Sequence, residues 1–190
     1  MRDDQCLPTH LAGHGLTPTD IDRVYLSDLH FDHADGLCEF SGCDAHVHVH
    51  VQMLEPALTA ALAQADNAYF ADDFTGTYVD QNSLKPQRDE YERVPGVQAI
   101  NTPGHLVGLV SLLIELPQGK PVILTGDAAD LQENLTDDIA PGLCWQDRED
   151  LASASICKLK GSAADTDAQL WPNHDMAFWR TLNRFPEYHA

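Results

Sequence analysis

The residues with the clearest chemical potential lie in one short stretch, residues 26–36. It presents two kinds of metal-ligating side chain within six positions: Asp28, His30, Asp32 and His33. Carboxylates and imidazoles in this mixture bind divalent metals of borderline softness, namely Zn, Mn, Fe or Co. Asp28, His30 and Asp32 alternate, so an extended loop would point them the same way and His33 elsewhere. The spacing predicts one loop serving two adjacent metal ions; the alternative is a polar, solvated loop that happens to hold two histidines.

Further residues of the same types stand where a predicted strand gives way to a loop. His105 follows the strand-like residues 96–100, Asp127 ends the apolar residues 122–125, and His174 follows residues 169–172. Residues 23–27 form a corresponding strand before the first cluster. Strand ends are the usual places for residues that a rigid scaffold holds for function. Taken singly, His105 and Asp127 have the alternative interpretation of turn residues, and Asp127 that of a helix N-cap.

Taken together, the motifs D-x-H-x-D-H, T-P-G-H, T-G-D and a late H-D resemble the metallo-β-lactamase superfamily and follow its order. Phe31 and Ala34, the long strand after T-P-G-H and the closing residues 184–188 are most similar to its N-acyl homoserine lactone lactonases. The resemblance runs from about Leu16 to the C-terminus and implies an α/β fold, an αββα sandwich. Since only 27 residues precede Asp28, we expect the first N-terminal strands to be missing. Residues 1–190 are then a single, N-terminally incomplete domain.

The resemblance also implies a site with two divalent metal ions, most readily Zn, with Mn, Fe or Co as alternatives. One ion would take Asp28, His30 and His105, the other Asp32, His33 and His174, and Asp127 would bridge them. A metal-bridging hydroxide would open the lactone ring of N-acyl homoserine lactones, which quenches quorum signals, and Asp32 would carry a proton to the leaving alkoxide. The alternatives are hydrolysis of another ester, thioester or phosphodiester, and a weakly active or inactive metal-binding remnant.

Two positions depart from the pattern of these lactonases. Position 28 is Asp where they carry a His, so we expect a weaker or partly empty first metal site. The catalytic position 130 is Asp where they place a Tyr that donates to the carbonyl region of the substrate. An ionised Asp130 accepts instead and repels a developing oxyanion, and losing such a donor costs on the order of 10²–10³ in rate. Both departures favour the remnant hypothesis.

The composition disfavours several classes of binding partner. The formal net charge of −19, from 30 acidic and 11 basic residues, disfavours nucleic acid and anionic membranes. Five cysteines without a C-x-x-C pair argue against a disulfide framework and predict a reducing cytoplasm. No apolar run approaches a membrane span. We therefore expect a cytoplasmic protein that acts on a small-molecule lactone or ester, without nucleic-acid or membrane partners; a homodimer is a further expectation from the resemblance.

Alternation of histidine and valine over residues 44–51 predicts a half-buried strand with valines inward and histidines outward. A second zinc site with Cys38 and Cys43 is the weaker interpretation of these histidines. The remaining expected elements are a helix at 52–65, a long loop with a short helix at 66–95, a hairpin of strands 106–116 and 121–125, a helix at 146–160 that ends over 161–165, and a last helix at 176–182.

Overall fold

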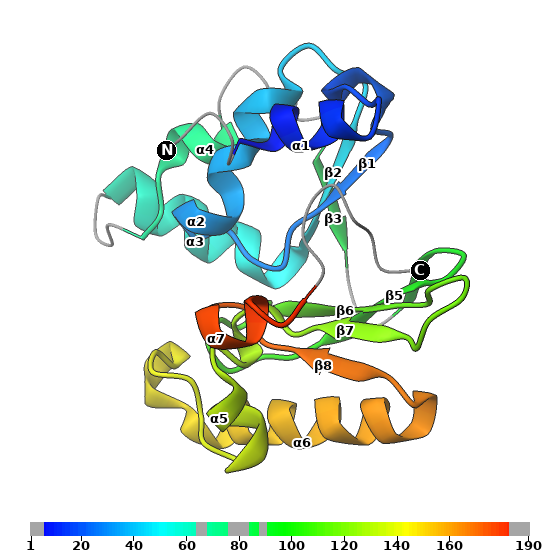
Figure 1. The fold of residues 1–190 in the computed structure, drawn as a ribbon. Helices are drawn as coiled ribbons and strands as arrows, with labels where there is room; N and C mark the ends of the chain where they lie inside the picture. Colours follow the sequence, from blue (N-terminus) through cyan, green and yellow to red (C-terminus); the bar gives the residue numbers. More distant parts are fainter. Residues whose placement is uncertain (1–5, 64–67, 76–83, 88–90, 183–190) are drawn as a thin grey trace. The chain divides into compact units, whose positions relative to one another are not determined.

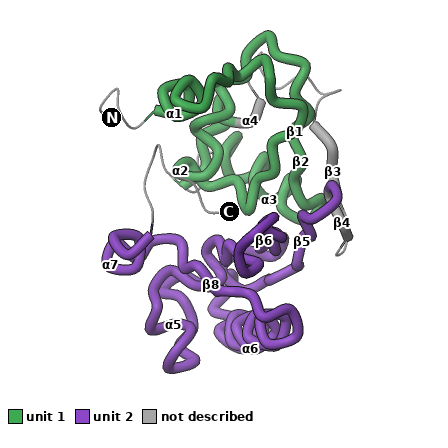
Figure 2. Tube along the Cα trace, turned by 45° about the vertical axis from the view of Figure 1, so that its right-hand side comes forward, with its two compact units in different colours: residues 1–87, 184–188 green, residues 88–183, 189–190 purple. Residues whose placement is uncertain are grey.

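The computed structural model describes residues 6–63, 68–75, 84–87 and 91–182. The chain divides into two compact units, and each is described by itself. Unit 1 is residues 1–87 and 184–188, and unit 2 is residues 88–183 and 189–190 (Figure 2). Nothing in this division tests the prediction that residues 1–190 form one domain, which stays a prediction. In the described part of the chain, no helix is both long enough and apolar enough to span a membrane.

Unit 1 is built on a three-stranded parallel sheet in the order β1-β2-β3 (Figure 1). Its strands are β1 (Arg23–Tyr25), β2 (His46–His50) and β3 (Leu84–Gln87). Its helices are α1 (Leu7–Gly13), η2 (Pro18–Asp20), α2 (Phe31–Ala34), η3 (Asp35–Phe40), α3 (Val51–Ala63) and α4 (Ala71–Thr75). Val47, Val49, Met53 and Ala57 from β2 and α3 are all buried. The predicted strand and the helix that follows it are confirmed.

The histidine face of β2 is solvated only in part. His46 is exposed as predicted, whereas the His48 ring stacks on Tyr25 with a centroid separation of 4.5 Å. His50 is buried, and its Nδ1 accepts from the N–H of Gln52 at 3.3 Å. The prediction that the histidines face solvent is wrong for His50, because α3 begins at the next residue and covers the end of the strand. Among the described residues, no group of potential metal ligands includes Cys38 or Cys43.

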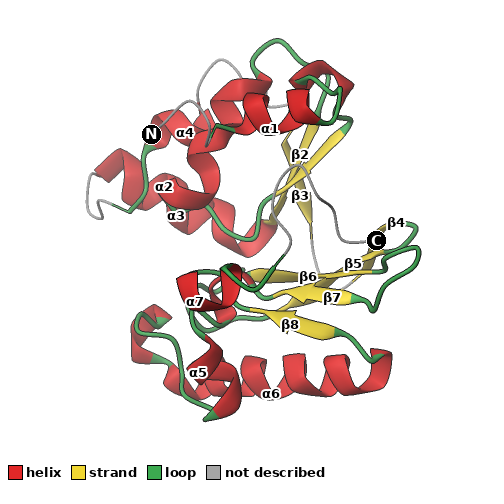
Figure 3. Cartoon of the chain, in the orientation of Figure 1, coloured by secondary structure: helices red, strands yellow, loops and turns green. Residues whose placement is uncertain are grey.

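Unit 2 is built on a five-stranded sheet in the order β4-β5-β6-β7-β8 (Figure 3). The strands are β4 (Tyr91–Val94), β5 (Val97–Asn101), β6 (Val110–Ile114), β7 (Val122–Leu124) and β8 (Gln169–Trp171). All neighbours are antiparallel except β7 and β8. The helices are η4 (Gly126–Ala128), α5 (Gln132–Thr136), η5 (Trp145–Asp147), α6 (Glu149–Thr166) and α7 (Met176–Trp179). The β6–β7 hairpin is confirmed, and the parallel pair is connected through α6, as a crossover requires.

Several predicted boundaries are wrong. The strand predicted from residue 106 begins only at Val110, and the last helix, predicted to reach residue 182, ends at Trp179. Residues 66–95 contain the expected short helix, α4, but they also contain β3 and β4 where only a loop was expected. Their sequences lack apolar alternation, and pairing with β2 and β5 gives β3 and β4 their strand conformation. Helix α6 runs through Gly161 to Thr166 and ends where Asp167 takes the left-handed conformation at φ 55°. The long buried stripe of Ala152, Ile156 and Leu159 holds this helix in place. Residues 64–67, 76–83, 88–90 and the closing 184–188 lie outside the described residues.

Candidate metal centre

The unit 1 cluster consists of four side chains on the segment after β1: Asp28, His30, Asp32 and His33. The segment is anchored by the N–H of Leu26, which donates to the carbonyl of His48 at 3.0 Å. Asp28 is fully buried, and its Oδ1 accepts from the backbone N–H of His30 at 2.9 Å. Its Oδ2 lies 3.2 Å from Nδ1 of His33. A single buried carboxylate therefore organises both histidines of the motif.

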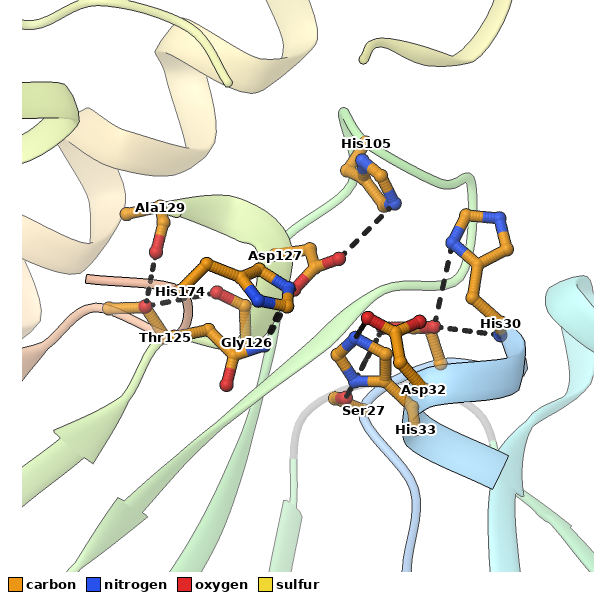
Figure 4. A network of polar contacts seen from close by, with 12 residues as sticks. Ser27, His30, Asp32, His33, His105, Thr125, Gly126, Asp127, Ala129 and His174 are labelled. Carbon is orange, nitrogen blue, oxygen red and sulfur yellow. Dashed lines mark hydrogen bonds and ion pairs between the residues drawn. The ribbon is translucent and has the colours of Figure 1, made fainter. Parts of the chain in front are cut away.

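Asp32 and His33 lie in the first turn of α2, so the extended loop expected from the alternation is wrong at this point. The helical turn brings His33 next to Asp28, and its Nδ1 also contacts Oγ of Ser27 at 2.9 Å (Figure 4). Asp32 lies at the edge of the cluster with 39% of its side chain exposed, and its Oδ2 is 3.7 Å from Nε2 of His33. The four side chains are thus close together. The alternation predicted that Asp32 would lie on the same side as Asp28, but it is His33 that lies beside Asp28.

The unit 2 cluster also has four members: His105, Asp127, Asp130 and His174. The T-P-G-H loop that carries the first of them packs directly on α6. A Cβ at Gly104 would lie 2.5 Å from Cα of Ala152, so only glycine allows this approach. The Oγ of Ser155 donates to the carbonyl of Pro103 at 2.6 Å and fixes the loop further. The glycine of the motif therefore serves to place the histidine that follows it.

The tautomer of His105 follows from its neighbours. Its Nδ1 lies 2.9 Å from the carbonyl oxygen of Leu143, which can only accept, so Nδ1 carries the proton. In the neutral ring, the lone pair of Nε2 then faces Oδ2 of Asp127 at 3.4 Å (Figure 4). Two acceptors facing each other at this distance suit a shared cation. A backbone carbonyl holding the far nitrogen is also the usual support of a metal-binding histidine.

Asp127 is buried within η4, directly after β7. Oγ1 of Thr125 lies within 3.1 Å of the carbonyls of Gly126, Ala129 and Trp171, which fixes the turn against β8. Oδ1 of Asp127 accepts from Nδ2 of Asn173 at 2.8 Å and lies 3.2 Å from Nε2 of His174. Because the N-cap of η4 is Thr125, the alternative interpretation of Asp127 as a helix N-cap is wrong.

Asp130 and His174 are joined through their backbones. The N–H of His174 donates to the carbonyl of Asp130 at 2.9 Å. Burial raises the pKa of the Asp130 carboxyl, and the negative charge of Asp127 raises it further. Asp175, next in the chain, accepts from the N–H groups of Phe178, Gln132 and Ala177, and the first of these contributes most to lowering its pKa.

Sequence reasoning named the candidate ligands but missed the residues that hold them in place. Asn173 contacts Asp127 across 46 positions, and Leu143 contacts His105 across 38. No spacing signal marks such a pair, although Asn173 stands next to a predicted ligand. Ser27 could have been noticed because it directly precedes the first motif.

Comparison with known proteins identifies the family of the chain. No family model matches it. An N-acyl homoserine lactonase from Bacillus sp is 33% identical over 189 residues, which cover 99% of this chain and 69% of that protein. The chain belongs to the N-acyl homoserine lactonase family. The predicted family is therefore confirmed by sequence.

Solved structures agree. An N-acyl homoserine lactone hydrolase, with the product N-hexanoyl-L-homoserine bound at its catalytic metal centre, is 31% identical with a TM-score of 0.83. The match covers 100% of this chain and 70% of that chain. A hydrolase of the beta lactamase superfamily, 18% identical, has a TM-score of 0.68 and covers 89% of this chain and 62% of its own. These two matches confirm the predicted α/β fold of the metallo-β-lactamase type.

Proposed function

We propose that the chain is a metal-dependent hydrolase that opens the lactone ring of N-acyl homoserine lactones and so quenches quorum signals. One observation carries the proposal: a family relative, 31% identical over the whole chain, holds N-hexanoyl-L-homoserine at its catalytic metal centre. That compound is the ring-opened product of the lactone. In the reaction, water adds to the ring carbonyl, the ring C–O bond breaks, and a carboxylate and a hydroxyl remain.

The donor chemistry of both clusters fits divalent metals. Imidazole nitrogens and carboxylate oxygens gather in both clusters. His30, His105 and Asp127 are buried, whereas Asp32 and His174 are exposed. Nε2 of His105 faces Asp127. We assign seven residues to two ions: Asp28, His30 and His105 to one, Asp32, His33 and His174 to the other, and Asp127 to both. Imidazole-rich sets suit Zn, and Mn, Fe or Co are also compatible.

When bound, such ions polarise a carbonyl and lower the pKa of water toward about 7. The protein supplies the rest. Asp32, with its partly exposed carboxylate, takes the proton from the attacking water and delivers it to the leaving oxygen. Asp28 orients His30 and His33, and Asn173 holds Asp127. Asp130 accepts rather than donates, so it gives no hydrogen bond to a developing oxyanion and lowers the rate.

The other proposals rest on the sequence. The odd number of cysteines supports a cytoplasmic location, and family resemblance supports a homodimer and one domain over residues 1–190. Hydrolysis of another ester, thioester or phosphodiester is separated from lactone opening by comparing substrates. An inactive metal-binding remnant is the second candidate function, favoured by Asp28 and Asp130 in place of the family's His and Tyr.

The test is ring opening of N-hexanoyl homoserine lactone by the full chain, loaded with Zn or Mn and measured for metal content. Opening is followed by the gain of one water in mass. We expect turnover that a chelator abolishes and added metal restores, and His105→Ala to remove it. Metal-loaded protein without turnover on any lactone would support the remnant instead.

The two departures from the family pattern give a second comparison. With metal at saturating concentration, Asp28→His and Asp130→Tyr, singly and together, are expected to raise the rate of ring opening, by about 10²-fold for the restored donor at position 130. Asp137→Tyr is the matched control, because Asp137 is an exposed carboxylate in the same unit. If neither restored residue changes the rate, the roles assigned from the family are wrong. Activity that exists only in the doubly restored chain supports the remnant.

A further inference from the structure

Asp130 has an oxygen that nothing in the proposed two-metal assignment uses. Its Oδ1 is shielded from solvent and has no hydrogen-bond partner in the described part of the chain. Buried carboxylate oxygens normally have one, because an unpaired buried acceptor loses its hydration without compensation. This oxygen therefore needs an explanation beyond the sequence departure from Tyr to Asp.

The backbone fixes where this carboxylate lies. Residues 129 and 130 accept hydrogen bonds from the N–H groups of Asn173 and His174, at 3.1 and 2.9 Å. These two bonds set the chain after β7 beside the chain after β8. Oγ1 of Thr125 adds a contact to the carbonyl of Ala129 at 3.1 Å. Asp130 is thus held next to His174 by main-chain bonds that its side chain does not influence.

The side chains then converge. Asp127, Asp130 and His174 each offer one ligand atom, and these three atoms lie within 4.8 Å of one another. Nε2 of His174 is 3.2 Å from Oδ1 of Asp127. Two carboxylates and an imidazole at this separation form a site for one cation, since two carboxylates alone repel each other. All three residues belong to unit 2.

We propose that Asp130 is itself a metal ligand and that unit 2 binds a divalent cation through Asp127, Asp130 and His174. This rests on the proposed function only in treating Asp127 and His174 as ligands. A carboxylate in this position adds negative charge and a hard oxygen to the set, which moves the preference from Zn toward Mn²⁺ or Fe²⁺. The departure at position 130 therefore changes the metal site rather than merely losing a donor.

The first experiment measures metal affinity in the full chain. Protein stripped with a chelator is titrated with Mn²⁺, and free Mn²⁺ is followed by electron paramagnetic resonance. We expect Asp130→Asn to weaken binding by more than about tenfold, the lower end of losses for changes next to a metal ligand. Asp137→Asn removes the same charge from an exposed position in unit 2 and should change nothing. Equal affinity in the wild type and Asp130→Asn overturns the proposal.

Thermal unfolding of the metal-free proteins separates a ligand from a structural residue. Asn removes a charge beside Asp127, so metal-free Asp130→Asn should unfold at the same temperature as the wild type or higher. The increase in unfolding temperature that Mn²⁺ causes should be smaller in Asp130→Asn than in the wild type. A residue that only supports the fold would lower the unfolding temperature without metal, and that result also overturns the proposal.

Direct coordination has a spectroscopic signature. Asp130→Cys loaded with Co²⁺ should show a thiolate-to-cobalt charge-transfer band that the wild type and Asp137→Cys lack, because only a coordinated sulfur gives one. A missing band, in a variant that still binds Co²⁺, places position 130 outside the coordination sphere. Lactone opening is measured separately. If metal binding depends on Asp130 but no lactone is opened, only the proposed function is refuted. If the lactone is opened and Asp130→Asn binds metal as tightly as the wild type, only this inference is refuted.

Discussion

The two clusters of candidate ligands are built in opposite ways. All members of the unit 1 cluster come from residues 28–33, and contacts over two to six positions organise them, such as the bond from the His30 N–H to Asp28. Members of the unit 2 cluster come from three segments. Their contacts with one another, His105 with Asp127 and Asp127 with His174, span 22 and 47 positions. The contacts of His105 with Leu143 and of Asp127 with Asn173 span 38 and 46 positions. The first cluster is local, and the second depends on the packing of β7, β8 and α6.

This difference predicts where each cluster is vulnerable. A local cluster is disturbed by changes within its own segment, because its hydrogen bonds close before the rest of the chain is involved. A cluster of long-range contacts is disturbed by changes in residues that are not ligands and lie far away in sequence. Substitutions at Gly104, Asp28 and Asp175 test this contrast, in order of decreasing expected effect.

Gly104→Ala should have the largest effect. The added Cβ would lie 2.5 Å from Cα and 2.7 Å from Cβ of Ala152. Neither atom can move aside, because Cα belongs to the backbone of α6 and the Cβ of alanine is fixed to that backbone. The loop must move away from α6, so we expect a loss of about 3 kcal/mol in the free energy of unfolding. His105, the next residue, moves with the loop, and metal affinity should fall. Denaturant unfolding and metal titration measure the two effects.

Gly161→Ala is the matched control for this substitution. Gly161 lies in α6 of the same unit, and a Cβ there meets nothing within 4 Å. Alanine in a helix is favoured over glycine by roughly 0.5–1 kcal/mol, so this variant should be more stable than the wild type. If both glycine variants behaved alike, the packing of the T-P-G-H loop on α6 would not be what holds His105.

Asp28→Ala should have the next largest effect, and it tests the local cluster. Asp28 is fully buried and accepts the N–H of His30, so alanine leaves that donor unsatisfied at a cost of about 2 kcal/mol. Asp28→Asn keeps an acceptor for this N–H and should lose less. Asp44→Ala, at an exposed carboxylate of the same unit, is the control.

Measuring these variants without metal separates the two roles of Asp28. A loss of stability in metal-free Asp28→Ala reports the hydrogen bonds, whereas a loss of metal affinity in Asp28→Asn reports ligation. Should metal-free Asp28→Ala be as stable as the wild type, the carboxylate does not organise the segment. The description of the unit 1 cluster as locally built would then be wrong.

The same contrast explains what the sequence could and could not reveal. The strands before each motif, the β6–β7 hairpin and α3 were predictable because apolar periodicity and turn residues are local signals. The candidate ligands could be proposed from the sequence because their types and spacing repeat a family pattern. The place of His33 beside Asp28 was not, because two-residue alternation describes an extended chain and Asp32 already lies in α2.

Features that depend on distant residues could not be predicted from the sequence for a different reason. β3 and β4 have no apolar alternation and take strand conformation from the partners they pair with. The end of α6 was misplaced because Gly161 reads as a helix stop, yet the buried Ile156 and Leu159 hold the helix to its sheet. The support of Asp127 by Asn173 depends on β7 and β8 being neighbours, which sequence spacing does not encode.

Asp175→Ala should have the smallest effect at neutral pH, and its signature is a dependence on pH. The Asp175 carboxylate accepts N–H bonds from Phe178 and from Gln132, 43 positions away, and the bond from Phe178 contributes most to holding its pKa below 3.8. A group with a lowered pKa in the folded state stabilises the protein above its unfolded pKa. That contribution is lost as the pH falls through the folded value.

Thermal unfolding of Asp175→Ala and the wild type from about pH 7 down to about pH 3 follows this loss. The variant should unfold at a lower temperature near neutrality, and the difference should shrink as the pH falls below 3.8. Asp165→Ala, at an exposed carboxylate on α6, is the control for removing a carboxylate from the same unit. A constant difference for Asp175→Ala would show that its carboxylate does not join α7 to residue 132. The long-range description of the segment that carries His174 would then lose one of its supports.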